Sequence, residues 1–383
     1  MEHRPLRLGI VGGSISTGCC LPSFFESGSK AGNDSFAGLL AQARVGGMPL
    51  QVSNQAEGAS GSSLASYCAL DWFDADEPLD YLLIEFAAND LYLSTSSCHS
   101  ADAKLLDTPK ASMERLLLNW RAARPTTALV ILHVCGPSKA LRAAHCDDHD
   151  DNLTAAYGAH GISLRRSLSP EQFSAISWDR MGIHPDAAGH RAIADLVLDL
   201  LRQHASASAS AGSALPLAHS PPAAGLARDA WRCRMCRSDA ACPALRPMGN
   251  GGAGGGFRLS GRQLSYSHIV KVGWVGNRTG DEVSFHVGRA RPVLLGLLCS
   301  YENVGVANVS LDHVSHQVDL QWRKKSSQMC VMPFAGDGAS GVLSIRVASR
   351  DHGRGSNQVK LMAVIQQRSS SVCNERNSSS TLS

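Results

Sequence analysis

The chain has 383 residues, more than one compact domain usually holds, which predicts two domains. A hydrophobic fraction of 44% is enough to build cores and excludes general disorder. The 36 basic and 33 acidic side chains give a formal net charge of +3 and form no basic stripe, so nucleic-acid binding is not expected. No uninterrupted apolar run is long enough to predict a membrane span.

The cysteine content and the glycosylation sequons bear on the compartment. The chain has 12 cysteines, and N-x-S/T sequons occur at Asn33, Asn152, Asn277, Asn308 and Asn377. Both features favour an oxidising lumen, whereas the sequence begins without a cationic and apolar leader, which favours the cytoplasm. We expect a secretory or extracellular protein whose targeting segment precedes the given sequence.

A segment rich in Ala, Ser and Pro divides the chain. Residues 205–227 cannot bury enough apolar surface to fold, which predicts a flexible linker. The remaining segments are expected to be an N-terminal domain (1–204), a second domain (228–368) and a disordered tail (369–383).

The two domains differ in their hydrophobic patterns. Before the linker, nearly continuous apolar runs predict strands at 6–11, 50–53, 79–87 and 129–134, and periodic stripes predict helices at 36–45, 63–70, 112–122 and 187–201. This alternation predicts a parallel sheet covered on both faces, with ligands at the carboxyl ends of its strands. After the linker, short strands of an antiparallel sandwich are predicted at 263–270, 282–287, 293–299, 307–311, 318–322, 329–332, 342–347 and 359–365.

Ser14 follows the first predicted strand in the turn Gly12-Gly13-Ser14. Such a turn exposes the hydroxyl and lets the backbone N–H approach a substrate oxygen. Glycine turns at this place also bind nucleotide phosphates, but the GxGxxG spacing and the acidic residue of a dinucleotide site are missing.

Two further segments offer donors for a developing oxyanion. Asn89 stands just beyond the third predicted strand, where its side-chain amide can donate to an oxyanion, although an ordinary Asn-Asp turn is the alternative. The small-residue loop 54–63 follows the second strand and contains Gly58, whose N–H can face the same spot.

The segment 178–190, before the last helix, offers a base. His184 can take a proton and Asp179 can orient it, although a lone histidine before proline is usually structural. Ser16 and His190 are weaker competitors, because Ser16 lies further from the strand and His190 falls within the helix start.

The order and spacing of these four segments resemble the GDSL, or SGNH, family of hydrolases over about residues 6–203. The resemblance implies a flavodoxin-like three-layer α/β/α sandwich and serine-dependent ester hydrolysis or acyl transfer. It also implies that Ser14 is the nucleophile and His184 the general acid and base. The oxyanion hole would comprise the N–H groups of Ser14 and the Gly58 loop together with the Asn89 amide.

The sequence departs from the family pattern at three positions. Gly13 replaces the usual aspartate before the serine. Ala59 occupies the commonest place of the oxyanion glycine, which leaves Gly58 or Gly61 for that role. Met181 stands where the family aspartate precedes the histidine by three residues, so Asp179 completes a triad only if the loop bulges by two residues. Otherwise a backbone carbonyl orients His184.

In the second domain, Cys233, Cys236 and Cys242 lack a clear fourth ligand, which favours a disulfide or burial over zinc. Trp274, Tyr301 and Trp322 would either stack on sugar rings or lie in the core. Together with residues 297–305, the two tryptophans look like the accessory β-sandwich of plant- and algal-type GDSL proteins, which suggests that this domain contacts carbohydrate.

We therefore expect a carboxylic ester hydrolase that removes a short acyl group, such as acetyl, from a glycan or a small molecule. No cofactor or metal is expected. An O-acyltransferase with the same Ser-His machinery and a catalytically inactive carbohydrate-binding protein, suggested by Met181, are the alternatives.

Overall fold

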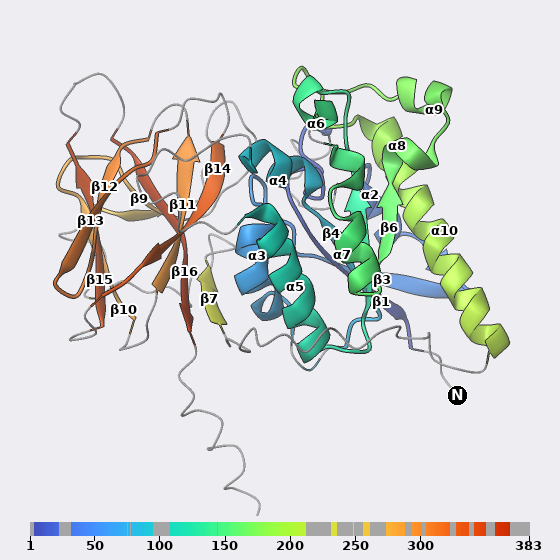
Figure 1. Cartoon of the computed structure of the whole chain (residues 1–383), viewed down its shortest axis with the longest axis horizontal. Helices are drawn as coiled ribbons and strands as arrows, with labels where there is room; N and C mark the ends of the chain where they lie inside the picture. Colours follow the sequence, from blue (N-terminus) through green and yellow to red (C-terminus); the bar gives the residue numbers. More distant parts are fainter. Residues whose placement is uncertain are drawn as a thin grey trace, which may run out of the picture. The chain divides into compact units, whose positions relative to one another are not determined.

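The computed structural model describes two compact units, one formed mainly by the chain up to residue 224 and one formed mainly by the chain from 225 (Figure 1). The described residues are 4–22, 32–74, 76, 78–94, 108–143, 145–211, 231–235, 248, 256–260, 273–287, 293–300, 304–321, 327–336, 341–349 and 357–367.

The N-terminal unit is built on a six-stranded sheet in the order β2-β3-β1-β4-β5-β6. Neighbouring strands from β3 to β6 run parallel, and β2 is antiparallel to β3. Every residue of β4 and β5 is buried, in keeping with their continuous apolarity. The strands are β1 (Leu6–Gly12), β2 (Arg44–Val45), β3 (Met48–Asn54), β4 (Tyr81–Glu85), β5 (Ala128–His133) and β6 (His160–Ser163).

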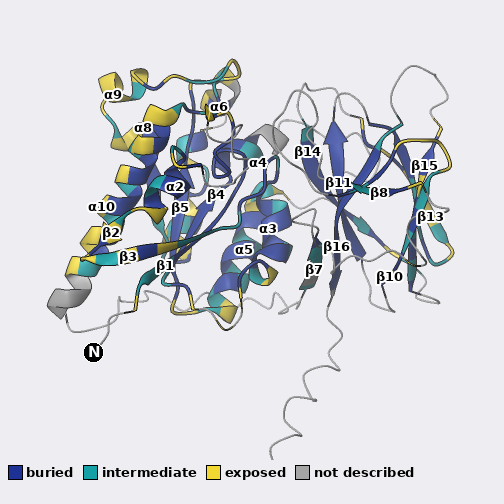
Figure 2. Cartoon of the chain, turned by 180° about the vertical axis from the view of Figure 1, so that it is seen from behind, coloured by how far each residue is buried: buried dark blue, intermediate teal, exposed yellow. Residues whose placement is uncertain are grey.

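Helices cover both faces of this sheet, which confirms the predicted three-layer α/β/α architecture (Figures 1 and 2). α3 packs with α5 on one face, and α2 packs with α10 on the other. The α-helices are α2 (Phe36–Ala41), α3 (Ser62–Cys68), α4 (Ala87–Ser94), α5 (Pro109–Ala123), α6 (Lys139–Ala143), α7 (Asp151–Ala156), α8 (Leu164–Ser167), α9 (Pro170–Ser174) and α10 (Ala187–Ala211). The short 3-10 helices are η1 (Ala69–Asp71) and η3 (Cys146–Asp148). None of the helices within the described residues is long and apolar enough to cross a lipid bilayer.

The strand order reverses between β1 and β4. After β1 the chain crosses to β3 on one side, whereas after β4 it continues to β5 and β6 on the other side. Open α/β sheets bind ligands at such a reversal, outside the carboxyl ends of the strands. Ser14 follows β1 and Asn89 follows β4, so both predicted site residues lie at this point.

Several elements of the N-terminal unit differ from the predicted ones. β6 and the short helices α7, α8 and α9 span only four to six residues each, too few for a hydrophobic period to show in the sequence. α10 continues through residues 205–211, where a linker is predicted, because alanine sustains a helix better than any other residue. Residues 212–227 and the predicted tail lie outside the described residues.

The second unit consists of two antiparallel sheets, which confirms the predicted all-β domain. One sheet has the order β10-β15-β12-β13; the other has the order β14-β11-β16-β9-β8, with β7 also pairing with β16. Every residue of β11 is buried, whereas β12 and β15 alternate between buried and partly exposed residues. The strands are β7 (Trp231–Met235), β8 (Arg258–Ser260), β9 (Gly273–Gly276), β10 (Glu282–His286), β11 (Val293–Ser300), β12 (Val306–Leu311), β13 (Val314–Asp319), β14 (Ser327–Phe334), β15 (Val342–Ala348) and β16 (Val359–Gln367).

The strand predicted at 318–322 is wrong in its limits. β13 begins at Val314, because a tight hairpin with Asp312 in the left-handed region (φ 58°) joins it to β12. β7, β8 and β9 are additional short strands, and the strand predicted at 263–270 lies outside the described residues.

Candidate active site

The segment that carries Ser14 is a tight turn anchored to the neighbouring strand. The Gly13 N–H donates to the Glu85 carbonyl oxygen at the end of β4 (3.1 Å). The Ser14 carbonyl accepts hydrogen bonds from the Thr17 hydroxyl (2.8 Å) and the Cys19 N–H (3.0 Å). These bonds fix the backbone on both sides of the serine, whose exposed fraction is 6%.

Ser16, the competing serine, is turned into the protein. Its hydroxyl donates to Glu85 Oε2 (2.9 Å), and both residues are buried. Burial raises the pKa of Glu85 to about 7, although the Ser16 hydroxyl and the backbone N–H groups of Gly13 and Ser16 oppose the shift. Ser16 therefore ties the turn after β1 to the end of β4 by a buried hydrogen bond.

Ser14, His184 and Asp179 form a continuous hydrogen-bonded chain. Ser14 Oγ lies 2.7 Å from His184 Nε2, and His184 Nδ1 lies 2.6 Å from Asp179 Oδ2. Ser14 and His184 are separated by 170 positions in the sequence, so the fold brings them together. A hydroxyl, an imidazole and a carboxylate in this order match the geometry of a nucleophile, its base and the orienter of the base.

A local bulge lets Asp179 reach His184 from five positions away. Gly182 adopts the left-handed region (φ 67°), which favours glycine, and its N–H donates to the Asp179 carbonyl (2.9 Å). Trp178 and Pro185 close the loop as an isolated antiparallel bridge. Met181, which stands at the family's aspartate position, lies on the outside of the loop with an exposed fraction of 43%.

The second oxygen of the Asp179 carboxylate organises the loop itself. Asp179 Oδ1 accepts hydrogen bonds from the N–H groups of Met181 (3.2 Å), Ile183 (2.9 Å) and His184 (3.3 Å). Burial raises the pKa of Asp179, but the hydrogen bonds from His184 and Ile183 outweigh it and leave this pKa below its usual value. Asp179 therefore stays ionised while it contacts the imidazole.

His184 has a raised pKa. Burial lowers the pKa of His184, but its hydrogen bonds with Asp179 and Cys20 and their negative charges outweigh burial and raise the pKa to about 9. His184 can take the Ser14 proton only in its neutral form, so a pKa of about 9 favours that role at alkaline rather than neutral pH.

The Asn89 side chain meets the turn of Ser14 and the loop after β3. Asn89 lies in the first turn of α4, where its Nδ2 donates to the Ser60 carbonyl (2.5 Å). The same loop contacts β1, because the Glu57 N–H donates to the Gly12 carbonyl (2.9 Å). Gly58 is buried in this loop, between Glu57 and Ser60. The predicted oxyanion segments are thus adjacent.

Ala59 lies in the loop after β3, and His190 packs in the core. Ala59 lies in the left-handed region (φ 63°) of the loop after β3. His190 is fully buried, its Nδ1 accepts a hydrogen bond from the Phe36 N–H (3.2 Å), and its ring stacks on the Phe36 ring. Burial, reinforced by the charge of His184, lowers the pKa of His190 to about 4.

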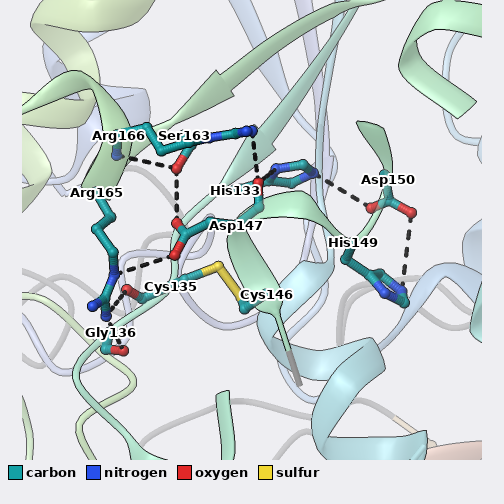
Figure 3. Close-up of a disulfide and its surroundings, with 10 residues drawn as sticks. All are labelled: His133, Cys135, Gly136, Cys146, Asp147, His149, Asp150, Ser163, Arg165 and Arg166. Carbon is teal, nitrogen blue, oxygen red and sulfur yellow. Dashed lines mark hydrogen bonds and ion pairs between the residues drawn. A yellow bond between two sulfur atoms is a disulfide. The ribbon is translucent and has the colours of Figure 1, made fainter. Parts of the chain in front are cut away.

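A disulfide joins the loop after β5 to the 3-10 helix η3 (Figure 3). Cys135, just beyond β5, is bonded to Cys146. Arg165 donates to the carbonyl oxygens of Cys135 (3.2 Å) and Gly136 (2.9 Å). A Cβ at Gly136 would lie only 2.0 Å from the Gly182 carbonyl, so the two loops are in close backbone contact.

Two adjacent cysteines border the site, and we did not identify them from the sequence. Cys19 Sγ and Cys20 Sγ lie 3.1 Å apart, and Cys20 is exposed with its backbone in the left-handed region (φ 75°). The hydrogen bond with Cys19 lowers the pKa of Cys20, burial opposes the shift and His184 adds to it, leaving a pKa of about 5. The sequence contained one signal for them, because two consecutive cysteines follow Ser14 within six residues.

In the second unit, the structure describes part of the predicted candidates. Cys233 is disulfide-bonded, whereas Cys236 and Cys242 lie outside the described residues. Trp274 packs edge-to-face on Phe285, as a core aromatic does. Tyr301 and Trp322 lie outside the described residues.

Residues 10–192 match the family model described as GDSL-like lipase/acylhydrolase. The chain therefore contains a GDSL-like lipase/acylhydrolase domain over these residues. This GDSL-like domain makes the protein a hydrolase of carboxylic esters, as the sequence predicts. None of the curated proteins matches the sequence significantly.

Solved structures share the fold of this GDSL-like protein. A two-domain esterase active on acetylated mannans, co-crystallized with mannopentaose, is 14% identical with a TM-score of 0.59; the match covers 95% of this chain and 91% of that one. Another structure of a two-domain esterase active on acetylated mannans is 15% identical with a TM-score of 0.58, covering 95% and 92%. An acetyl-xylooligosaccharide esterase from Geobacillus is 16% identical with a TM-score of 0.40, covering 52% of this chain and 96% of that one. The first two comparisons show the two-domain fold.

Proposed function

We propose that the N-terminal unit is a serine esterase in which Ser14 is the nucleophile, His184 the general acid and base, and Asp179 the residue that orients His184. The observation that carries this proposal is the unbroken chain from Ser14 Oγ to His184 Nε2 (2.7 Å) and from His184 Nδ1 to Asp179 Oδ2 (2.6 Å). Met181 therefore no longer favours an inactive protein, because Asp179 supplies the carboxylate from another position.

The proposed reaction has two steps. The Ser14 hydroxyl attacks the ester carbonyl while His184 Nε2 takes its proton, and His184 then returns that proton to the leaving alcohol. Water, activated by the same histidine, releases the acyl group from Ser14. Proton transfer by a positioned imidazole supplies on the order of 10²- to 10⁴-fold in rate.

Donors near Ser14 would stabilise the negative charge that forms on the carbonyl oxygen. We assign this role to the Ser14 N–H, the Gly58 N–H and the Asn89 side-chain amide. The adjacency of Asn89 with the Ser60 carbonyl and with Gly13 supports the assignment. Each such donor is worth on the order of 10²- to 10³-fold in kcat.

We propose an O-acetylated glycan as the substrate. The whole-chain likeness to two-domain esterases active on acetylated mannans supports this choice, because it includes both units. A contact between the second unit and the sugar chain stays a prediction. The buried Cys135–Cys146 disulfide supports the expected secretory or extracellular location, since disulfides persist in oxidising compartments.

The test is hydrolysis of p-nitrophenyl acetate and release of acetate from acetylated mannan by the full chain. Ser14→Ala should abolish both activities and prevent labelling by a fluorophosphonate, while the thermal melt stays close to that of the parent. Ser16→Ala is the competing variant and should still be labelled, because Ser14 remains. Full activity of Ser14→Ala would refute the proposal. Product formation that is faster with an added sugar acceptor than with water would assign acyl transfer instead.

A further inference from the structure

Cys19, Cys20 and His184 form a cluster of three metal-ligating side chains beside Ser14. One ligand atom from each of the three residues lies within 4.8 Å of those of the other two. Both cysteines are thiols, with Cys19 buried and Cys20 exposed. Ester hydrolysis as proposed above uses His184 and leaves both thiols without a role.

We propose that Cys19, Cys20 and His184 bind a thiophilic closed-shell cation, such as Zn²⁺ or Cd²⁺, and that the bound cation inhibits the esterase by occupying His184. The binding site stands on the cluster alone. The inhibition rests on the proposed function, because it assumes that His184 serves Ser14.

The ligand set suits such a cation. Two thiolates and one imidazole are the donors that soft or borderline cations prefer, and three protein ligands leave one position for water or Ser14 Oγ. Zn–S bonds of about 2.3 Å in a tetrahedron place two sulfurs about 3.8 Å apart. The Cys19 and Cys20 sulfurs are 3.1 Å apart, so a small rotation of the exposed Cys20 side chain would admit the ion. Binding would release to the buffer the protons that the three ligand side chains hold.

Asp179 already provides the outer support that a metal-bound histidine requires. A histidine ligand commonly donates its other ring N–H to a carboxylate, which fixes the tautomer and strengthens the ligand. His184 Nδ1 is held by Asp179 Oδ2 (2.6 Å), which leaves Nε2 for the cation. Nε2 is also the nitrogen that contacts Ser14 Oγ (2.7 Å), so a cation at Nε2 would take the base away from the serine.

The backbone of Cys20 has an uncommon conformation. Cys20 has a φ of 75°, a region that residues other than glycine rarely adopt. Gly18, two residues earlier, also has a positive φ (74°). In this conformation the Cys20 sulfur lies 3.1 Å from the Cys19 sulfur. Cys20 is also exposed to solvent, so an ion can reach it.

The experiment is a Cd²⁺ titration of the reduced full-length protein, followed by the ultraviolet thiolate-to-cadmium charge-transfer band. We expect one bound ion per chain and a parallel loss of p-nitrophenyl acetate hydrolysis with Zn²⁺ or Cd²⁺ that a chelator reverses. Cys20→Ser should weaken binding by at least about 100-fold, and Asp179→Asn by about 10- to 100-fold. Cys299→Ala, which removes a thiol from the second unit, is the matched control and should bind normally.

Ser14→Ala separates the two proposals, because it removes the nucleophile and keeps all three ligands. It should show the same charge-transfer band as the parent chain even though its esterase activity is lost. The metal site is refuted if the parent shows no band, or if Cys20→Ser, folded by circular dichroism, keeps the band. Inhibition is scored within each variant as the ratio of activities with and without Zn²⁺. If the parent binds the ion but is equally active with and without Zn²⁺, the ion does not occupy His184 and this part of the proposal is wrong.

Discussion

Gly13 and the Asn89 side chain are so close that a Cβ at residue 13 would lie 2.2 Å from Asn89 Nδ2. Gly13→Ala should therefore displace the Asn89 amide and lower kcat by up to about 10²- to 10³-fold, the usual loss for one oxyanion donor, with a smaller effect on KM. Steady-state kinetics on p-nitrophenyl acetate measures this. Gly161→Ala in β6 is the control, since its new Cβ would meet the Thr154 side chain at an ordinary 3.5 Å. An unchanged kcat in Gly13→Ala would remove Asn89 from the oxyanion hole.

The proposed catalytic role of Asp179 can be separated from its role in holding the loop. Asp179→Asn keeps an oxygen for the loop N–H groups but no longer holds a proton on His184 Nδ1, so kcat should fall on the order of 10⁴-fold with little change in the melt. Asp179→Ala also loses the loop hydrogen bonds and should lower the free energy of unfolding by about 1.5–3 kcal/mol. Equal melting temperatures for the two variants would contradict the structural role of Oδ1.

The Cys135–Cys146 disulfide should stabilise the N-terminal unit. Replacing both cysteines by alanine should lower the free energy of unfolding by about 2–4 kcal/mol, the usual value for a loop of this length. Urea unfolding of the purified chain measures the difference. Cys299→Ala serves as the comparison for the loss of a buried cysteine. A double variant as stable as the parent would show that the loop retains its structure without the bond.

His190 should make stability depend on pH between about 4 and 6.5. Its pKa is lowered to about 4 in the folded protein, so in this range the unfolded chain binds a proton that the folded chain does not. Its contribution is therefore lost as pH falls from about 6.5 to about 4, by about 3 kcal/mol in all.

His190→Gln is the variant that isolates this contribution, because it keeps an acceptor for the Phe36 N–H but does not titrate. Glu85 and Asp90, with pKa values raised to about 7 and about 8, favour the folded state at low pH and act in the opposite direction. The measurement is thus the difference in unfolding free energy between parent and variant at each pH. A difference that does not change from pH 7 to pH 4 would disprove the role of His190.

Long periodic segments of the sequence were sufficient to predict most of the fold. β4 and β5 are continuous apolar runs and were predicted to within two residues of their observed limits. The start of α10 was predicted correctly from its periodic apolar positions, but its end was placed ten residues too early. β6 was not predicted, because four residues that include a histidine and a glycine carry no clear period. Asn89 was placed at a strand end but lies in α4, which begins when the Asp90 N–H pairs with the Phe86 carbonyl.

The sequence was sufficient to name the candidate residues Ser14, His184 and Asp179. It did not predict the backbone conformations on which their geometry depends. The choice between Asp179 and a backbone carbonyl for His184 depended on a bulge that needs Gly182 at a positive φ. Cys20 was missed because nothing in the residue type indicates a left-handed conformation there. The positive φ angles of Gly182 and Cys20 depend on the packing of the folded chain, which residue type alone does not predict.

The candidate site lies where the strand order reverses, at the carboxyl ends of β1 and β4. Insertions in the segments that lead into the strands, such as the turn at residues 46–47 before β3, enter at the opposite edge of the sheet and would leave these strand ends in place. The edge that carries Ser14 and Asn89 can therefore keep its geometry while the opposite edge varies in length.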